Sequence, residues 1–111
     1  MEIATEELPG EITRVILAGS LDIAGAAAID LRMNVIAGAK RTVLVDLRQV
    51  SFIGSMGLSA LVAPARAIKS RGGKMVLFGP NQLVARVLRA SLVDTIIPVY
   101  NDLDAAIAAV R

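Results

Sequence analysis

Ser55 is the residue of this sequence whose position gives it the clearest chemical use. It follows the apolar run Val43–Leu47 by a few residues and stands where a helical pattern begins. The first amides of a helix have no intrahelical acceptor, and the helix dipole is positive there. A hydroxyl at such a place can cap the helix, or it can carry a phosphate. The residues alone leave both uses open, and capping is the more common one.

Nucleophilic catalysis at Ser55 is disfavoured by what surrounds it. The segment Gly54-Ser55-Met56-Gly57 resembles a nucleophile elbow only superficially, because that motif is Gly-x-Ser-x-Gly and Ile53 stands in place of its first glycine. The chain has no histidine to take the proton, and no lysine has a helical spacing that would aim it at Ser55. We therefore expect a protein that is not an enzyme.

Cofactor and metal sites are also not predicted. The chain lacks the Gly-x-Gly-x-x-Gly fingerprint of dinucleotide binding, and Ile68 occupies the first glycine of a phosphate loop ending at Gly73-Lys74. Cysteine and histidine are absent and the aspartates are dispersed, so no metal-ligand spacing is present. We expect no cofactor and no metal.

The elements that must position Ser55 follow from alternating strand and helix patterns. Strands are expected over residues 2–8, 12–18, 42–47, 74–78 and 95–99, and helices after Asp22, from Ser55, after Asn81 and over 103–110. Because Leu8-Pro9-Gly10-Glu11 is typical of a turn, the first two strands should be antiparallel. The pattern predicts an α/β fold with a mixed sheet of about five strands and four helices, in an order that it leaves open.

Several single residues carry local predictions. Asp22, Asn81 and either Asn101 or Asp102 are expected to cap helices, and Gly38 is expected to end the first helix in a left-handed turn. Pro64 should bend the helix that begins near Ser55. In the helix after Asn81, the side chains expected to face inward are Leu83, Val84, Val87 and Leu88.

Composition limits the class of protein. A length of 111 residues predicts one domain, residues 1–111, and 55% hydrophobic against 3% aromatic residues predicts an aliphatic core. So few aromatics disfavour a nucleic-acid stacking surface. The N-terminal segment lacks a signal-peptide pattern and no long apolar run is present, so we expect a cytoplasmic protein without a membrane partner. A basic cluster, Arg66, Lys69, Arg71 and Lys74, is either a solvated helix end or a contact for an anionic partner.

A resemblance narrows these alternatives. The segment Leu47–Leu58 resembles the signature of the STAS domain of anti-sigma factor antagonists, in which Asp-Leu-x-x-Val-x-Phe-Ile-Asp-Ser-Ser-Gly-Leu opens a helix. Gly19-Ser20-Leu21-Asp22 and Gly72–Leu77 are similar to other parts of the family, and the resemblance covers nearly the whole chain. Gly54 replaces the family's aspartate, and Met56 replaces its second Ser or Thr. Ser55 aligns with the serine that the partner kinase phosphorylates.

The resemblance implies a binding switch. Unmodified, the protein would bind an anti-sigma factor serine kinase of the GHKL type and so free a sigma factor; phosphorylation of Ser55 would weaken binding, and a metal-dependent phosphatase of the PP2C type would reset it. A monomer or weak dimer is expected. The implied partner-binding residues are Asp22, Gly54, Ser55, Met56, Gly57, Ser59, Ala60 and Ala63.

Two other functions stay open. The first is a STAS-like structural subunit of a signalling scaffold or transport-associated complex, in which Ser55 only caps the helix. The departures at Gly54 and Met56 favour it to some degree. The second is a small-molecule or nucleotide binder that uses the amides near Ser55.

Overall fold

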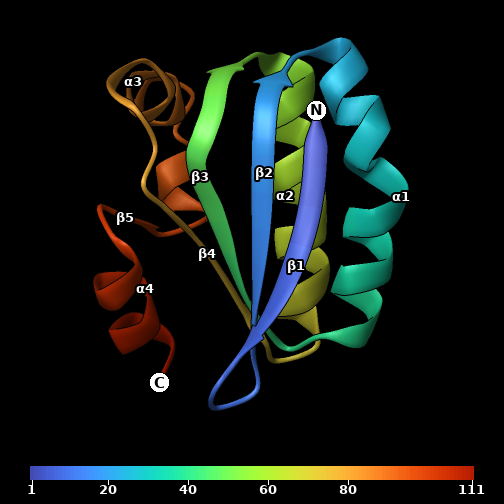
Figure 1. The fold of residues 1–111 in the computed structure, drawn as a ribbon, viewed down its shortest axis with the longest axis vertical. Helices are drawn as coiled ribbons and strands as arrows, with labels where there is room; N and C mark the ends of the chain where they lie inside the picture. The colour runs from blue at the N-terminus through green and yellow to red at the C-terminus, as the bar shows by residue number, and fades with distance from the viewer.

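The computed structural model describes residues 1–111 and contains one sheet whose five strands follow one another in chain order. Figure 1 shows the strands and helices in this arrangement. The strands are β1 (Glu2–Leu8), β2 (Ile12–Leu21), β3 (Thr42–Ile53), β4 (Lys74–Phe78) and β5 (Val99–Tyr100). The helices are α1 (Ile23–Ala39), α2 (Ser55–Ser70), α3 (Gln82–Ala90) and α4 (Leu103–Val110), with a short 3-10 turn, η1 (Val93–Thr95).

The sheet is mixed, as the sequence predicts. β1 pairs with β2 antiparallel, and the remaining neighbours pair parallel. The hairpin between β1 and β2 turns through Gly10 and Glu11, which have φ of +89° and +60°. A left-handed backbone at two successive residues gives a tight reversal, and glycine takes it without steric cost. The order of strands, which the sequence left open, is sequential.

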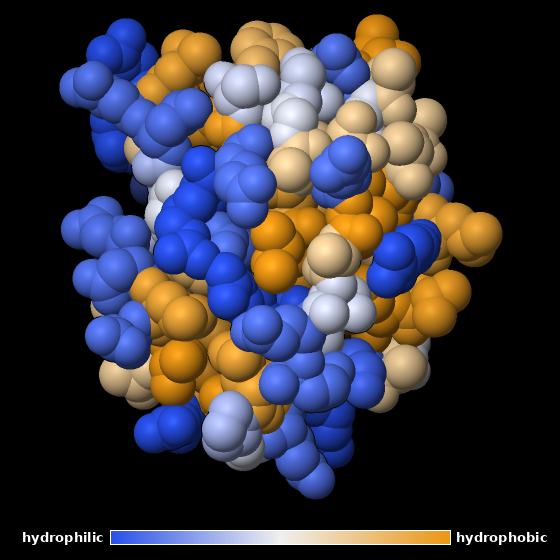
Figure 2. All heavy atoms as spheres, viewed as in Figure 1, coloured by the Kyte–Doolittle hydropathy of each residue, from blue (hydrophilic) through white to orange (hydrophobic).

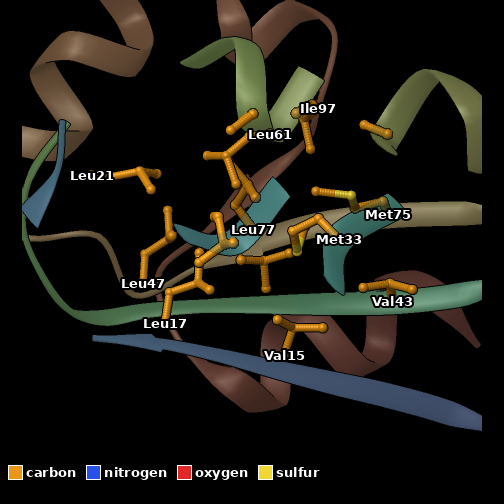
Figure 3. Close-up of a cluster of buried hydrophobic side chains, with 14 of the residues drawn as sticks. Val15, Leu17, Leu21, Met33, Val43, Leu47, Leu61, Met75, Leu77 and Ile97 are labelled. Atoms are coloured by element: carbon orange, nitrogen blue, oxygen red, sulfur yellow. The ribbon is translucent and has the colours of Figure 1, made fainter. Parts of the chain in front are cut away.

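Helices cover the two faces of the sheet unequally. In Figure 1, α2 lies behind β1 and β2 and α1 lies beside β1 at the right, while α4 lies near β4 and β5. The larger core fills the space beneath α1 and α2, and Figure 3 shows that its side chains are aliphatic or methionine. Alternation along β3 directs Val43, Val45 and Leu47 into this core and Leu44 into a smaller one beneath α4. The near absence of aromatic residues is thus compatible with a well-filled interior.

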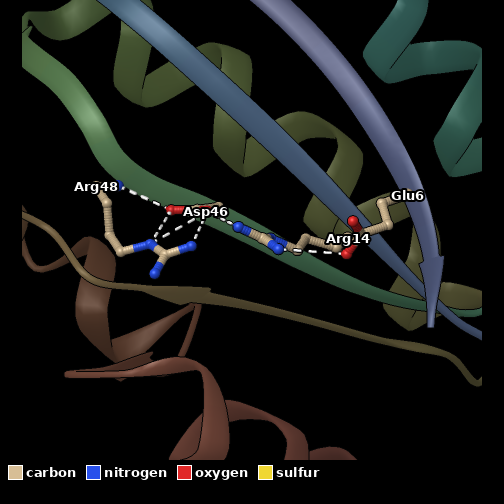
Figure 4. A network of polar contacts seen from close by, with 4 residues as sticks. All are labelled: Glu6, Arg14, Asp46 and Arg48. Carbon is tan, nitrogen blue, oxygen red and sulfur yellow. Dashed lines mark hydrogen bonds and ion pairs between the residues drawn. The ribbon is translucent and has the colours of Figure 1, made fainter. Parts of the chain in front are cut away.

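A charged network lies on the other face of the sheet and joins its first three strands (Figure 4). Asp46 on β3 is fully buried, and its carboxylate accepts hydrogen bonds from Arg14 Nη2 at 2.7 Å and Arg48 Nη2 at 2.8 Å. Arg14 in turn reaches Glu6 on β1 at 3.2 Å. Burial opposes ionisation of Asp46, but the hydrogen bonds from Arg48 and Arg14 outweigh it and lower the pKa of this carboxyl group.

Two strands are longer than predicted. β2 continues past Ala18 to Leu21, and β3 continues past Leu47 to Ile53. The pairing of these strands shifts register between Ile16 and Ala18 and again between Gly19 and Ser20. Irregular pairing of this kind breaks the strict alternation of apolar and polar residues, which is the signal that sequence reading depends on.

Other local predictions were wrong. Gly38 does not end α1, which continues to Ala39 and stops at Lys40 with an extended backbone. The expected strand at residues 95–99 is reduced to the two-residue β5, because Thr95 belongs to η1 and residues 96–98 are not part of a strand. Leu83 was expected to face inward, yet it is 49% exposed.

Asp22, Asn81 and Asp102 do cap their helices, and α2 runs through the buried Pro64 without interruption.

Candidate functional site

Ser55 is exposed and is the first residue of α2, but it does not cap the helix. The N-cap position belongs to Gly54, whose backbone is extended at φ −109° and ψ −174° and whose carbonyl accepts from the Leu58 N–H at 2.9 Å. No side chain caps this end. The interpretation of Ser55 as a helix cap is therefore wrong, because the N-cap lies one residue earlier. Only the residue before the first helical turn has the extended geometry that a cap requires.

The start of α2 is electrostatically prepared for an anion. Glycine at the N-cap has no side chain to bond the first amides, and no acidic residue lies in the first turn. These amides and the positive end of the helix dipole remain uncompensated by the chain itself. A phosphate on Ser55 would lie at this end, where its charge is locally favourable.

The position of Ser55 is set by contact with the end of the neighbouring strand. β2 and β3 end together, and the Gly54 N–H donates to the Leu21 carbonyl at 3.1 Å. A Cβ on Gly57 would lie only 2.3 Å from that same carbonyl oxygen and 2.7 Å from Leu21 Cγ. Glycine at position 57 therefore lets the first turn of α2 approach β2 closely enough to hold Ser55 at the surface.

Asp22 lies on the adjacent turn, directly after Leu21. Its Oδ1 accepts from the Gly25 N–H at 2.8 Å, and its Oδ2 accepts from the Ser20 hydroxyl at 3.3 Å. The hydrogen bond from Gly25 is the main reason that the pKa of Asp22 is lowered. Sequence reasoning did not identify Gly25 as a required glycine. In the folded chain a Cβ at this position would lie 2.1 Å from the Ser20 carbonyl oxygen. Asp22 is a structural cap of α1, and the residue is exposed.

An apolar groove of about 480 Å³ extends from this point between α1 and α2. From α2 it is lined by four of the predicted partner-binding residues: Met56, Ser59, Ala60 and Ala63. From α1 it is lined by Ile23, Ala26, Ala27 and Asp30. The structure thus brings together the α2 part of the predicted surface and adds a wall from α1 that the sequence did not indicate.

The exposed ridge of α1 that begins at Ile23 and Ala27 in this wall is apolar beyond the groove as well. Ile23, Leu31 and Val35 are 74%, 75% and 62% exposed, and with Ala27 they follow a spacing of four residues along one ridge. Hydrophobic side chains also gather over α1 at the right-hand edge of Figure 2. Because α1 is apolar on both its buried and its exposed side, its sequence shows no polar stripe that would have distinguished the two sides.

The fold and the exposed serine together define a class of protein. The family model of the STAS domain matches residues 2–106 of the chain. The chain belongs to the STAS domain family.

Individual relatives agree with this family. A Thermotoga maritima protein described as a candidate anti-sigma factor antagonist is 33% identical over 69 residues. That match covers 62% of this chain and 61% of the relative, so it spans about three fifths of the relative's length.

None of the helices is both long and apolar enough to cross a membrane.

Solved structures extend the likeness to the whole chain. An anti-sigma factor antagonist from Mycobacterium paratuberculosis is 28% identical, with a TM-score of 0.85, 99% of this chain covered and 95% of the other. The crystal structure of a candidate antagonist from Thermotoga maritima gives a TM-score of 0.90 at 23% identity, covering 98% and 94%. The Bacillus cell fate determinant SpoIIAA, solved in its phosphorylated form, gives 0.74 at 21% identity, covering 99% and 100%.

Proposed function

We propose that this chain is an anti-sigma factor antagonist whose binding is switched by phosphorylation of Ser55. The observation that carries the proposal is the position of Ser55: exposed, at an uncapped helix start, and within one residue of Met56 at the α1–α2 groove. The family membership and the antagonist relatives support the same function. The protein acts by binding and performs no catalysis itself.

In the unmodified state the apolar groove is the docking surface. An anti-sigma factor serine kinase of the GHKL type covers Met56, Ser59 and Ala63 and places its active site at Ser55. Exposed apolar residues beside a small polar rim are typical of such protein–protein surfaces. Occupying the kinase in this way frees the sigma factor, and the protein works in the cytoplasm as a monomer or weak dimer.

Phosphate at Ser55 reverses the interaction. It adds about −1.5 to −2 charges at the rim of an apolar surface that the partner must desolvate. The helix start tolerates this charge, so the cost falls on the complex rather than on the fold. A metal-dependent phosphatase of the PP2C type removes the phosphate and restores binding.

The direct test is to incubate the purified chain with ATP and a GHKL-type anti-sigma factor kinase from the same organism, and to locate phosphate by mass spectrometry. We expect one phosphate, on Ser55. Ser51 and Ser59 are exposed hydroxyls close in sequence and serve as internal controls, and Ser55→Ala should abolish the modification. Phosphate on another residue, with Ser55 unmodified, would contradict the proposal.

A substitution at Gly54 distinguishes the proposed switch from a purely structural role of the chain. A Cβ on Gly54 would meet the Phe52 ring at 3.4 Å, an ordinary contact, and the extended backbone accepts any residue. Gly54→Asp therefore restores the family's carboxylate without strain, and we expect several-fold faster phosphorylation of Ser55 together with a few tenths of a kcal/mol of added stability. Gly38→Asp, on the open face of α1, is the matched control. If neither variant is phosphorylated and the chain co-purifies in a large complex, the scaffold function replaces this one.

A further inference from the structure

A second groove lies at the far edge of the sheet. Its volume is about 340 Å³, and it runs along the start of β4, between the C-terminal part of α2 and the segment that precedes β5. We propose that this groove binds an extended acidic peptide segment of a partner protein, which adds to the sheet as a strand beside β4. This interaction does not involve Ser55.

The main chain of β4 has an unpaired edge in this groove. β5 pairs only with Leu77 and Phe78, so the start of β4 has no strand on its outer side (Figure 1). Along a strand, the N–H and C=O groups of one residue point to one neighbouring strand, and those of the next residue point to the opposite side. The Lys74 N–H bonds the Arg41 carbonyl before β3, and the Leu77 N–H bonds the Pro98 carbonyl on the other side. The N–H and C=O of Met75 therefore point toward the side where no strand pairs with them.

The charge of the groove selects an acidic partner. Lys69 and Lys74 line it, together with the hydroxyl-bearing Thr95 and Tyr100, and its lining contains no Asp or Glu. These lysines are half of the basic cluster that the sequence singled out. Arg71, by contrast, donates to the carbonyls of Ala37 and Lys40 at the end of α1 and is used structurally. Arg66 lines a separate surface with Leu58 and Val62.

The unpaired main-chain groups of the groove suit a strand better than a small anion. An exposed sheet edge offers both a donor and an acceptor, and an added peptide strand satisfies both. Alternate side chains of such a strand point to opposite faces of the sheet. One set would contact Ala65 and Lys69 on α2, and the other would contact Tyr100 and Ala109 near α4.

The two surfaces can be occupied independently. Ser55 and Lys69 lie at opposite ends of α2, which places their backbones about 21 Å apart at 1.5 Å per residue. A partner on the α1–α2 groove therefore leaves the β4 edge accessible. Phosphorylation at Ser55 should not alter peptide binding at β4.

The test is an NMR titration of the ¹⁵N-labelled chain with a blocked hexapeptide that alternates glutamate and valine. We expect amide shifts at Gly73, Lys74, Met75 and Val76, with those of Ser55 and Met56 unchanged. A lysine–valine peptide of the same length tests charge, and an N-methylated glutamate–valine peptide tests main-chain pairing. Both should bind at least about tenfold more weakly.

Matched variants localise the site. Ala109→Glu puts a carboxylate at the groove, whereas Ala108→Glu puts the same charge one residue away on the same exposed helix. We expect Ala109→Glu to weaken the acidic peptide about threefold and Ala108→Glu to leave it unchanged. The double variant Lys69→Glu/Lys74→Glu should weaken it about tenfold, while Arg86→Glu on α3 should not.

Any of three results would overturn the proposal: no amide shifts at Gly73–Val76, equal binding of the lysine or N-methylated peptide, or equal effects of the Ala108 and Ala109 variants. Sedimentation of the chain alone provides a further check. Concentration-dependent self-association that is lost in Lys69→Glu/Lys74→Glu would show that a second copy, with the glutamates of its β1, takes the edge instead of a partner peptide. Failure of Ser55 to be phosphorylated would leave all these outcomes unaffected.

Discussion

At the scale of single residues, three glycines differ in whether the structure requires them. Gly57 is required by contact, since Leu21 occupies the space that a Cβ would need. Gly54 is required by neither contact nor backbone, because its conformation is extended and the space around it accepts a side chain. Gly38 lies in the last turn of α1, and a Cβ there would meet no atom within 4 Å. Sequence alone does not distinguish these three cases.

Gly57→Ala and Gly38→Ala should therefore change stability in opposite directions. The Gly57 methyl group would collide with a carbonyl oxygen that β2 holds in place, and we expect a loss of about 1–3 kcal/mol. Gly38→Ala removes backbone entropy from the unfolded chain at an exposed helical position, and we expect a gain of about 0.5–1 kcal/mol. Urea denaturation of both variants measures the difference. A gain in stability for Gly57→Ala would refute the close approach of α2 to β2.

At the scale of elements, β3 bears the largest share of the architecture. It is the central strand, it contributes to both cores, and it leads directly into Ser55. Its buried Asp46 connects it to Arg14 on β2 through a charge-assisted hydrogen bond. Gly79, with φ +70°, lies against Arg48, whose guanidinium stacks on the Phe78 ring at 5.4 Å. The polar side of β3 is thus held between β2 and β4.

Asp46 should make the stability of the protein sensitive to acid. Because the pKa of the folded-state carboxyl is below its ordinary value of 3.8, the unfolded chain takes up this proton first as the pH falls. The stabilisation from Asp46 is therefore fully present above that ordinary value and declines as the pH falls through the folded-state pKa. Denaturation measured from pH 7 to pH 2.5 should show this decline.

Asp46→Asn tests the assignment. We expect a loss of about 3 kcal/mol at pH 7, since the variant leaves two arginines without their buried counter-ion, and a weaker dependence on acid. Asp30→Asn, at an exposed position on α1, is the matched control and should behave like the unaltered chain. An unchanged acid transition in Asp46→Asn would assign the pH dependence to other carboxylates.

At the scale of the whole molecule, the two ends of α2 present different surfaces. The N-terminal end has Ser55, an uncompensated helix start and the apolar α1–α2 groove. The C-terminal end has the basic groove at the unpaired edge of β4. In the proposed switch, phosphate is added to the first surface, at the helix end where the dipole favours negative charge. The proposed switch would therefore change the affinity of the molecule for its partner without a change of fold.

Ser55→Asp and Ser55→Ala separate affinity from stability. We expect both variants to unfold at nearly the same temperature as the unaltered chain. Ser55→Asp places a carboxylate against the desolvated partner surface and should weaken binding to the anti-sigma factor kinase at least about tenfold. Ser55→Ala should stay bound in the presence of ATP. Calorimetric titration with the kinase measures both, and equal affinity of the two variants would contradict a switch at this residue.

Much of the fold could be predicted from local patterns. β1, β4 and α4 have the predicted bounds, and the caps at Asp22 and Asn81 are confirmed. These features depend on the order of residues within one segment, so they are visible in the sequence. The prediction was wrong where a remote contact overrides the local pattern, as in the extended β3 and the shortened β5.

The sequence by itself determined the fold class, the aliphatic core, the absence of a histidine base and the serine that begins α2. Only the tertiary structure decided that Gly54 and not Ser55 takes the N-cap, that α1 lines half of the α1–α2 groove, and that β4 keeps an unpaired edge. The physical reason is that secondary structure follows from neighbours along the chain. Exposure, close approach and unsatisfied main-chain groups follow instead from segments such as Leu21 and Gly57, which meet only when the chain is folded.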